Sequence, residues 1–118
     1  MGAPDSQRFY PALELWARVL SVPEADLAIL NYGKRDAGND VGNPLPILKL
    51  GKKLEAFKGE IEKLNDQHAF MKISPGTVAV GDIVGCGISH PCTNFDKWHL
   101  LPLVNDNYDV IDLIHTHF

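Results

Sequence analysis

Residues 11–22 read PALELWARVLSV, and the alternation in this segment decides the fold. One set of alternate positions is apolar, and the other set is larger or charged. The apolar set is Leu13, Leu15, Ala17 and Val19, and the other set is Glu14, Trp16 and Arg18. A period of two places successive side chains on opposite faces of an extended chain. The segment therefore predicts a long β-strand with one face against a core.

Further short apolar segments follow, and turn-forming residues separate them. We expect strands at 27–30, 47–50, 61–73, 78–80, 83–84, 100–105 and 108–118. The segment 61–73 is expected to be a strand pair, or one strand with an irregularity near Asn65-Asp66. Asp106-Asn107 suits a tight hairpin turn, because both residues tolerate positive φ. This spacing indicates a mainly β fold, a small β-barrel or sandwich-like single domain with long loops.

Two segments rich in Gly, Asn, Asp and Pro are expected to be long loops. The first is NYGKRDAGNDVGNPLP at 31–46, and the second is GCGISHPCTNFDKW at 85–98. Long loops on a compact domain are often functional, and irregular coil is the alternative. The charged segment 51–60, GKKLEAFKGE, is expected to be a solvated turn or a short helical piece.

Composition bounds the class of protein. The chain has 118 residues, of which 45% are hydrophobic and 22% charged, and its formal net charge is -4. No basic face is visible, so we expect no nucleic-acid partner, and no apolar run reaches the roughly 18 to 20 residues of a membrane span. We expect a flexible leader at 1–8 and one domain at 9–118. No secretory signal is visible, which favours the cytoplasm.

His90-Pro91-Cys92 is the sharpest chemical feature of the sequence. Residues i and i+2 of extended backbone point to the same side, so this imidazole and thiolate can reach one metal ion. Pro91 has a fixed φ and stiffens the pair. Nitrogen plus thiolate sulfur suits zinc, and two ligands leave positions open for water, substrate or another residue. Spacing alone leaves open a loop histidine and a buried cysteine that bind nothing.

Other histidines and cysteines offer alternatives. Cys86 and Cys92 could form a disulfide across a short loop, although the missing secretory signal favours reduced thiols or ligands. His115 and His117 also stand at i and i+2, a pattern that more often marks an exposed strand end than a ligand pair. His68 has polar neighbours that could orient a ring nitrogen, and a hydrogen-bonded structural histidine is the alternative.

The residues around His90 and Cys92 resemble a known family. GISHPCTNFDKW at 87–98 and LPLVNDNYDVIDLIHTHF at 101–118 are similar to the C-terminal end of the amino-acid deaminases and aldolases related to D-serine dehydratase and D-threonine aldolase. The earlier segments PALELWARVLSVPEADLAILNYGKRD, LNDQHAFMKI and PGTVAVGDIV also fit this family. Together these segments cover nearly the whole chain after its first residues.

The resemblance implies a pyridoxal-phosphate lyase with two domains. An N-terminal alanine-racemase-like barrel domain would carry pyridoxal phosphate on a lysine. A C-terminal β-domain would supply the ligands of zinc or another divalent metal, which map onto His90 and Cys92. His68 maps onto a family histidine and would lie near the site. The implied substrate is a small β-hydroxy D-amino acid, cleaved by dehydration or retro-aldol chemistry, and the implied assembly is a homodimer.

The sequence departs from the family pattern in two ways. Asn31 stands where we expect an aspartate, and a barrel of roughly 200 or more residues is missing from these 118. No lysine has the context of a cofactor lysine, and we expect solvated charges at Lys34, Lys49, Lys52, Lys53, Lys58, Lys63, Lys72 and Lys97. We therefore expect no lyase activity from this chain alone. The alternatives are a non-catalytic binding or regulatory β-domain of this family, and a redox protein that uses Cys86 and Cys92.

Overall fold

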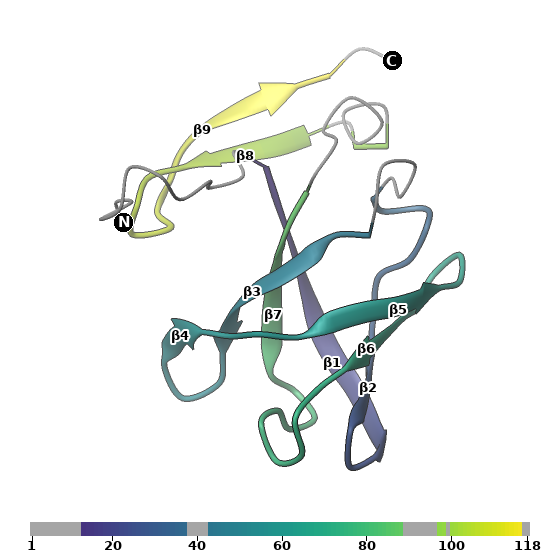
Figure 1. Ribbon diagram of the computed structural model, residues 1–118. Helices are drawn as coiled ribbons and strands as arrows, with labels where there is room; N and C mark the ends of the chain where they lie inside the picture. Colours follow the sequence, from purple (N-terminus) through teal and green to yellow (C-terminus); the bar gives the residue numbers. More distant parts are fainter. Residues whose placement is uncertain (1–12, 38–42, 89–96, 99, 117–118) are drawn as a thin grey trace, which may run out of the picture.

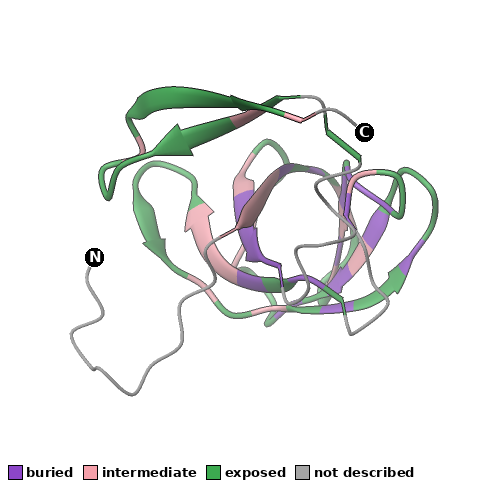
Figure 2. Cartoon of the chain, turned by 90° about the horizontal axis from the view of Figure 1, so that it is seen from above, coloured by how far each residue is buried: buried purple, intermediate pink, exposed green. Residues whose placement is uncertain are grey.

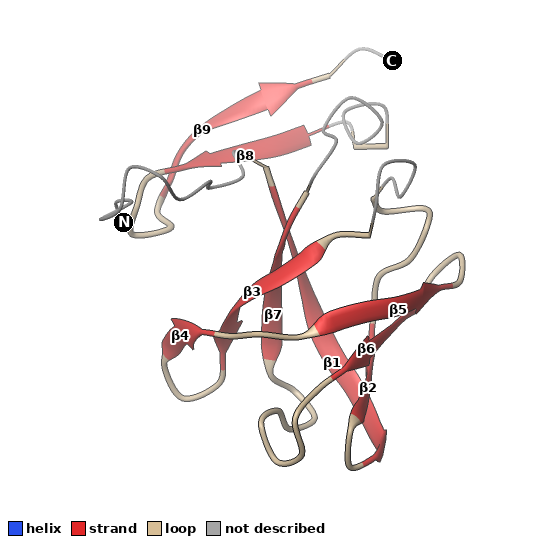
Figure 3. Cartoon of the chain, viewed as in Figure 1, coloured by secondary structure: helices blue, strands red, loops and turns tan. Residues whose placement is uncertain are grey.

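The computed structural model describes residues 13–37, 43–88, 97–98 and 100–116. These residues form strands, turns and loops without a helix, so the mainly β prediction is confirmed (Figure 3). It follows that none of them belongs to a helix that is long and apolar enough to cross a membrane. The predicted domain boundary at residue 9 lies outside the described residues and stays a prediction.

Seven strands form one antiparallel sheet, and two more form a separate hairpin (Figure 1). The bounds are β1 Glu14–Glu24, β2 Leu27–Leu30, β3 Leu45–Leu50, β4 Leu54–Ala56, β5 Glu60–Leu64, β6 Ala69–Lys72, β7 Ile83–Gly87, β8 Leu100–Val104 and β9 Val110–His115. The order in the large sheet is β4-β3-β7-β1-β2-β6-β5, and β8 pairs with β9. The large sheet curls into a half-barrel, and β5 contacts β3 across the opening.

The core lies inside the curled sheet (Figure 2). β1 shows the alternation that its sequence predicts in its middle part, since Ala17 and Val19 are buried and Arg18 and Leu20 are exposed. The largest fully buried side chains are Tyr32, Leu30, Met71, Val19, Val84, Pro44 and Cys86. Burial of apolar area contributes about 25 cal/mol per Å². This core holds the strands of the large sheet together.

The strand pair predicted for 61–73 is present. β5 and β6 are antiparallel, and the Asn65 amide donates to the His68 carbonyl oxygen at 2.8 Å in the turn between them. The predicted hairpin around Asp106-Asn107 is also present, between β8 and β9. However, the residue with positive φ is Tyr108, at 65°. The side chain of Asn105 determines the shape of this turn, because its Oδ1 accepts hydrogen bonds from the amides of both Asn107 and Asp109. This shape places the positive φ at Tyr108 and not at Asp106 or Asn107.

Four local predictions were wrong. The first long loop was expected to run to residue 46, but β3 begins at Leu45 because it pairs with Gly87 of β7. Residues 51–60 contain the short strand β4, because pairing with β3 replaces the expected solvated turn or helical piece. Residues 78–80 form no strand, because the Asp82 carboxylate accepts from the Ala79 amide at 2.9 Å and closes a turn. The second long loop was expected to begin at residue 85, but β7 runs to Gly87 because it pairs with both β1 and β3.

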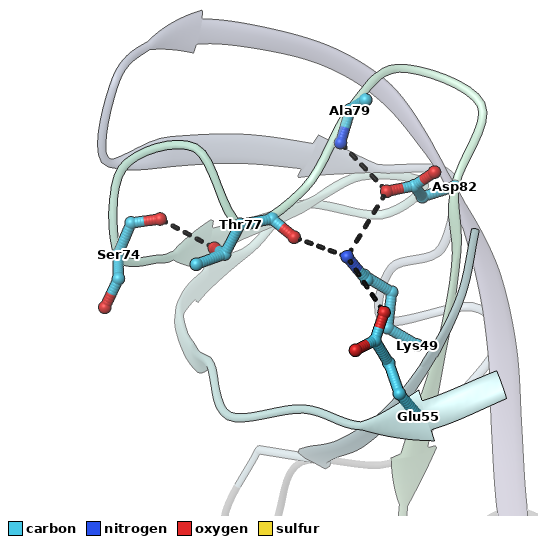
Figure 4. Close-up of polar contacts among 6 residues, drawn as sticks. All are labelled: Lys49, Glu55, Ser74, Thr77, Ala79 and Asp82. Atoms are coloured by element: carbon cyan, nitrogen blue, oxygen red, sulfur yellow. Dashed lines mark hydrogen bonds and ion pairs between the residues drawn. The ribbon is translucent and has the colours of Figure 1, made fainter. Parts of the chain in front are cut away.

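Lys49 was expected to be a solvated charge, and the structure corrects this (Figure 4). Its ammonium donates to the Thr77 carbonyl oxygen at 2.7 Å and lies 3.7 Å from a carboxylate oxygen of Glu55 and 4.0 Å from one of Asp82. Only 17% of the Lys49 side chain is exposed, so it joins β3, β4 and the turn before β7. The other seven lysines are exposed as predicted.

Candidate functional site

The predicted metal ligands His90 and Cys92 lie outside the described residues and stay predictions. The structure does place the two ends of their segment. The Ile88 amide donates to the Leu13 carbonyl oxygen at 3.0 Å, directly after β7. The Trp98 indole Nε1 donates to the Asp36 carbonyl oxygen at 2.7 Å, and the Thr116 hydroxyl donates to the Trp98 carbonyl oxygen. The segment therefore leaves β7 beside β1 and returns beside the loop that follows β2.

The loop that follows β2 is held against the turn between β5 and β6. The amides of Lys34 and Arg35 donate to the carbonyl oxygens of Asn65 and Asp66, at 2.9 and 3.1 Å. Gly33 permits this approach, because a Cβ there would lie 2.2 Å from the Asn65 carbonyl oxygen. The contact brings the first predicted loop next to His68.

Asn31 occupies the position where the family pattern leads us to expect an aspartate. Its side-chain oxygen accepts from the Arg18 amide at 2.8 Å, and its own amide donates to the Arg18 carbonyl oxygen at 3.1 Å. These bonds join the end of β2 to β1. The side chain of Asn31 therefore stabilises the contact between β2 and β1 as a neutral hydrogen-bond acceptor.

His68 is exposed and borders a polar hollow of about 360 Å³. The other residues around this polar hollow are Asn31, Arg35, Asp36 and Gln67. Asp36 also accepts the Trp98 indole hydrogen bond, so this hollow adjoins one end of the predicted ligand segment. The predicted role of His68 near the site stays a prediction, and the structure places its side chain in reach of solvent.

A second hollow of about 340 Å³ lies between the half-barrel and the β8–β9 hairpin. We call it the tryptophan hollow, after Trp16 and Trp98. Its lining includes Glu14, Asp36, Ile88 and Leu101. Sequence reasoning missed this feature, because its residues come from β1, β8 and two loop ends that are distant in the chain. The one hint of the tryptophan hollow in the sequence is the alternation of β1, which places Glu14 and Trp16 on the same face.

Glu14 organises one wall of the tryptophan hollow. Its Oε1 accepts from the Tyr108 hydroxyl at 2.8 Å and from the Trp16 indole at 3.1 Å. The rings of Trp16 and Tyr108 meet edge to face, with centroids 5.2 Å apart. Burial, with a further contribution from the Glu14 carboxylate, raises the pKa of Tyr108 above its ordinary range. Tyr108 therefore stays a neutral donor to Glu14.

Cys86 is a free, fully buried thiol. Burial raises the pKa of Cys86 to about 12, and the nearby Tyr32 hydroxyl lowers it by less. The Tyr32 hydroxyl is itself buried without a well-formed hydrogen bond to a described residue, and burial raises its pKa, with a smaller contribution from Cys86. A protonated, buried thiol is a poor nucleophile. These features count against a disulfide with Cys92 and against the redox alternative.

Within the described ranges, no group of three or more His, Cys, Asp or Glu side chains is arranged to hold a metal ion. These ranges therefore do not supply a closed, four-ligand structural site. The chemistry of the predicted pair, one imidazole and one thiolate, fits zinc with open coordination positions. Ile88 and Trp98, the described residues nearest to the two ends of the predicted ligand segment, both line the tryptophan hollow.

Comparison with known families decides which family this is. Residues 12–104 match a family model described as "Putative serine dehydratase domain". The chain belongs to the serine dehydratase domain family. The resemblance seen in the sequence is therefore confirmed at the level of the family.

A solved structure shares the fold of this serine dehydratase domain. It is D-threonine aldolase from Filomicrobium marinum, with a TM-score of 0.73 and 19% sequence identity. The match covers 96% of this chain and 29% of that chain, so the present chain spans under a third of the aldolase's length. At this identity the likeness shows the fold. No curated protein matches the chain.

Proposed function

We propose that this chain is the C-terminal β-domain of a pyridoxal-phosphate- and metal-dependent lyase. The lyase would act on small β-hydroxy D-amino acids, by dehydration or by retro-aldol cleavage. The observation that carries the proposal is the family match over 12–104, which spans His90-Pro91-Cys92. The fold shared with a D-threonine aldolase supports it. An alanine-racemase-like barrel domain would carry the cofactor.

His90 and Cys92 would be the ligands of zinc or another divalent metal. When bound, the metal would act as a Lewis acid on the substrate's β-hydroxyl, and pyridoxal phosphate would act as the electron sink. Two protein ligands leave coordination positions for that hydroxyl. Either reaction needs the same pair, so the pair does not distinguish a dehydratase from an aldolase.

The described residues would position this pair. The hydrogen bonds at Ile88 and Trp98 fix the two ends of the ligand segment, and Pro91 would stiffen its middle. Fixed ends reduce the entropy that is lost when two side chains are ordered around one ion. His68, on the polar hollow that adjoins Trp98 through Asp36, would contact the substrate or its bound water from the neighbouring turn.

We also propose a cytoplasmic location. The free thiol of Cys86 supports it, because cytosolic reductants keep thiols reduced. The chain alone would have no lyase activity, because the cofactor lysine would belong to the barrel domain.

Co-expression with an alanine-racemase-like barrel domain tests the proposal. Pyruvate release from D-serine and aldehyde release from D-threonine would be measured for the pair of proteins and for each protein alone. We expect activity only with both, and its loss with His90→Ala. His115→Ala is the matched control, because His115 is an exposed residue near the end of β9, and it should keep full activity. Equal activity of wild type and His90→Ala in the complex would overturn the proposal.

A further inference from the structure

One short turn lies between the turn that carries His68 and the end of the predicted ligand segment. It consists of residues 33–37, and we call it the bridging turn. The Asp36 carboxylate accepts from the Gly33 amide at 3.0 Å, and the Gly33 carbonyl oxygen accepts from the amides of Asp36 and Ala37 at 3.0 and 3.3 Å. Ala37 is fully buried in the core. The bridging turn is therefore closed by its own hydrogen bonds and anchored in the half-barrel.

On one side, the bridging turn holds the turn that carries His68. The amides of Lys34 and Arg35 donate to the carbonyl oxygens of Asn65 and Asp66. The Asn65 amide donates in its turn to the His68 carbonyl oxygen at 2.8 Å. The position of the His68 backbone thus depends on the bridging turn through a short series of backbone hydrogen bonds.

On the other side, the bridging turn holds Trp98, which lies 62 residues after Asp36 in the chain. The Trp98 indole Nε1 donates to the Asp36 carbonyl oxygen at 2.7 Å, and the Trp98 carbonyl oxygen accepts from the Thr116 hydroxyl. Asp36 lines both the polar hollow and the tryptophan hollow. This link depends on a side chain, so a single substitution can remove it.

We propose that Trp98 is a positioning residue. Its indole bond fixes the end of the ligand segment against the bridging turn, and so sets the place of the metal-binding pair relative to His68. The inference rests on the proposed function, because it assigns an anchor to the proposed metal site. An anchored segment loses less conformational entropy when two of its side chains are ordered around one ion. Because linkage is reciprocal, metal bound to the pair would in return hold Trp98 on Asp36 and tighten the bridging turn.

The other tryptophan provides a matched comparison. Trp16 also lines the tryptophan hollow, but its indole donates to Glu14 of the same strand at 3.1 Å. That bond lies within β1 and joins it neither to the bridging turn nor to the ligand segment. Trp16 and Trp98 thus present the same donor in the same hollow with different connections.

Zinc titration of the whole chain by calorimetry tests the anchor. Trp98→Phe keeps an aromatic ring and removes the indole donor, and we expect the zinc affinity to fall about fivefold, the contribution of one neutral hydrogen bond. Trp16→Phe is the matched control and should keep the wild-type affinity. Thr116→Val removes the hydroxyl that holds the Trp98 carbonyl oxygen. It should also lower the affinity, and it replaces Trp98→Phe if that variant does not fold.

Amide hydrogen exchange separates positioning from a general effect on stability. In the wild-type chain, zinc should slow exchange at Lys34 and Arg35, whose amides hold the turn that carries His68. In Trp98→Phe, saturating zinc should leave exchange at these two amides unchanged. A residue that only stabilises the fold would alter the exchange rates of both amides without making them depend on zinc.

The outcomes distinguish this inference from the proposed function. The wild-type zinc affinity in Trp98→Phe, or an equal loss of affinity in Trp16→Phe, would overturn the positioning role and leave the metal site standing. A zinc effect on the two amides that is absent in wild type, or equal in Trp98→Phe, would do the same. Equal zinc affinity in wild type and in the His90→Ala/Cys92→Ala double variant would overturn the metal site and the positioning role together.

Discussion

Gly33→Ala is the sharpest test of how the candidate site is held together. A Cβ at residue 33 would lie 2.2 Å from the Asn65 carbonyl oxygen and 2.5 Å from the Asp66 carbonyl carbon and oxygen. These are backbone atoms, so no flexible side chain can move aside. The loop after β2 must separate from the turn between β5 and β6.

The cost follows from what separates. The amide hydrogen bonds of Lys34 and Arg35 to that turn would be lost or weakened, at about 1 kcal/mol each. Crowding of packed atoms adds about 1 to 3 kcal/mol. We expect the free energy of unfolding to fall by about 4 kcal/mol, which lowers the melting temperature by roughly 15 °C in a domain of this size.

Urea unfolding, followed by circular dichroism, measures this change. Gly76→Ala is the matched control, because its φ is 79° and nothing lies within 4 Å of the added Cβ. It should cost only about 1 to 2 kcal/mol, for the left-handed backbone alone. A Gly33→Ala cost no larger than that of Gly76→Ala would refute the close approach.

Two further predictions concern buried polar groups. Lys49→Met should lower the free energy of unfolding by about 1 to 2 kcal/mol, because the Thr77 and Asp82 contacts are lost, whereas exposed Lys52→Met should change it by less than about 0.5 kcal/mol. Burial raises the pKa of Cys86 to about 12. The thiol of the unfolded chain therefore ionises at a lower pH than the thiol of the folded chain. As a result, the free energy of unfolding keeps its full value below about pH 8.5 and falls as the pH rises. Urea unfolding should show a loss of about 1 kcal/mol between pH 8.5 and 9.5 in wild type and a smaller one in Cys86→Ala; an equal loss in both would contradict the assignment.

The sequence predicted the strands well where one face is buried and the other is not. β1 and the β5–β6 pair follow this rule, because alternation records which side meets the core. Prediction from alternation failed at residues 85–87. Gly and Cys are typical of loops there, but these residues belong to β7, which lies between two partner strands. Burial on every side leaves no alternation to detect. It failed at residues 54–56 for a different reason, because β4 is exposed and exists only through pairing with β3.

The candidate site was predictable only where its residues are neighbours in the sequence. His90-Pro91-Cys92 could be proposed as a donor pair because its spacing is local, and this pair stays a prediction. Trp16, Trp98 and Glu14 could not be recognised together, because the fold alone unites β1 with the end of a distant loop. Lys49 was misread for the same reason, since Thr77 and Asp82 are distant in the sequence.

Zinc titration by calorimetry tests the central claim, that His90 and Cys92 form a metal site with open positions. We expect wild type to bind zinc weakly, because two ligands give little chelation. His90→Ala and Cys92→Ala should each reduce the affinity by at least about tenfold, which is ~1.4 kcal/mol. Cys86→Ala, which removes a buried thiol outside the pair, should keep the wild-type affinity. Equal zinc affinity in wild type and the His90→Ala/Cys92→Ala double variant would contradict the claim.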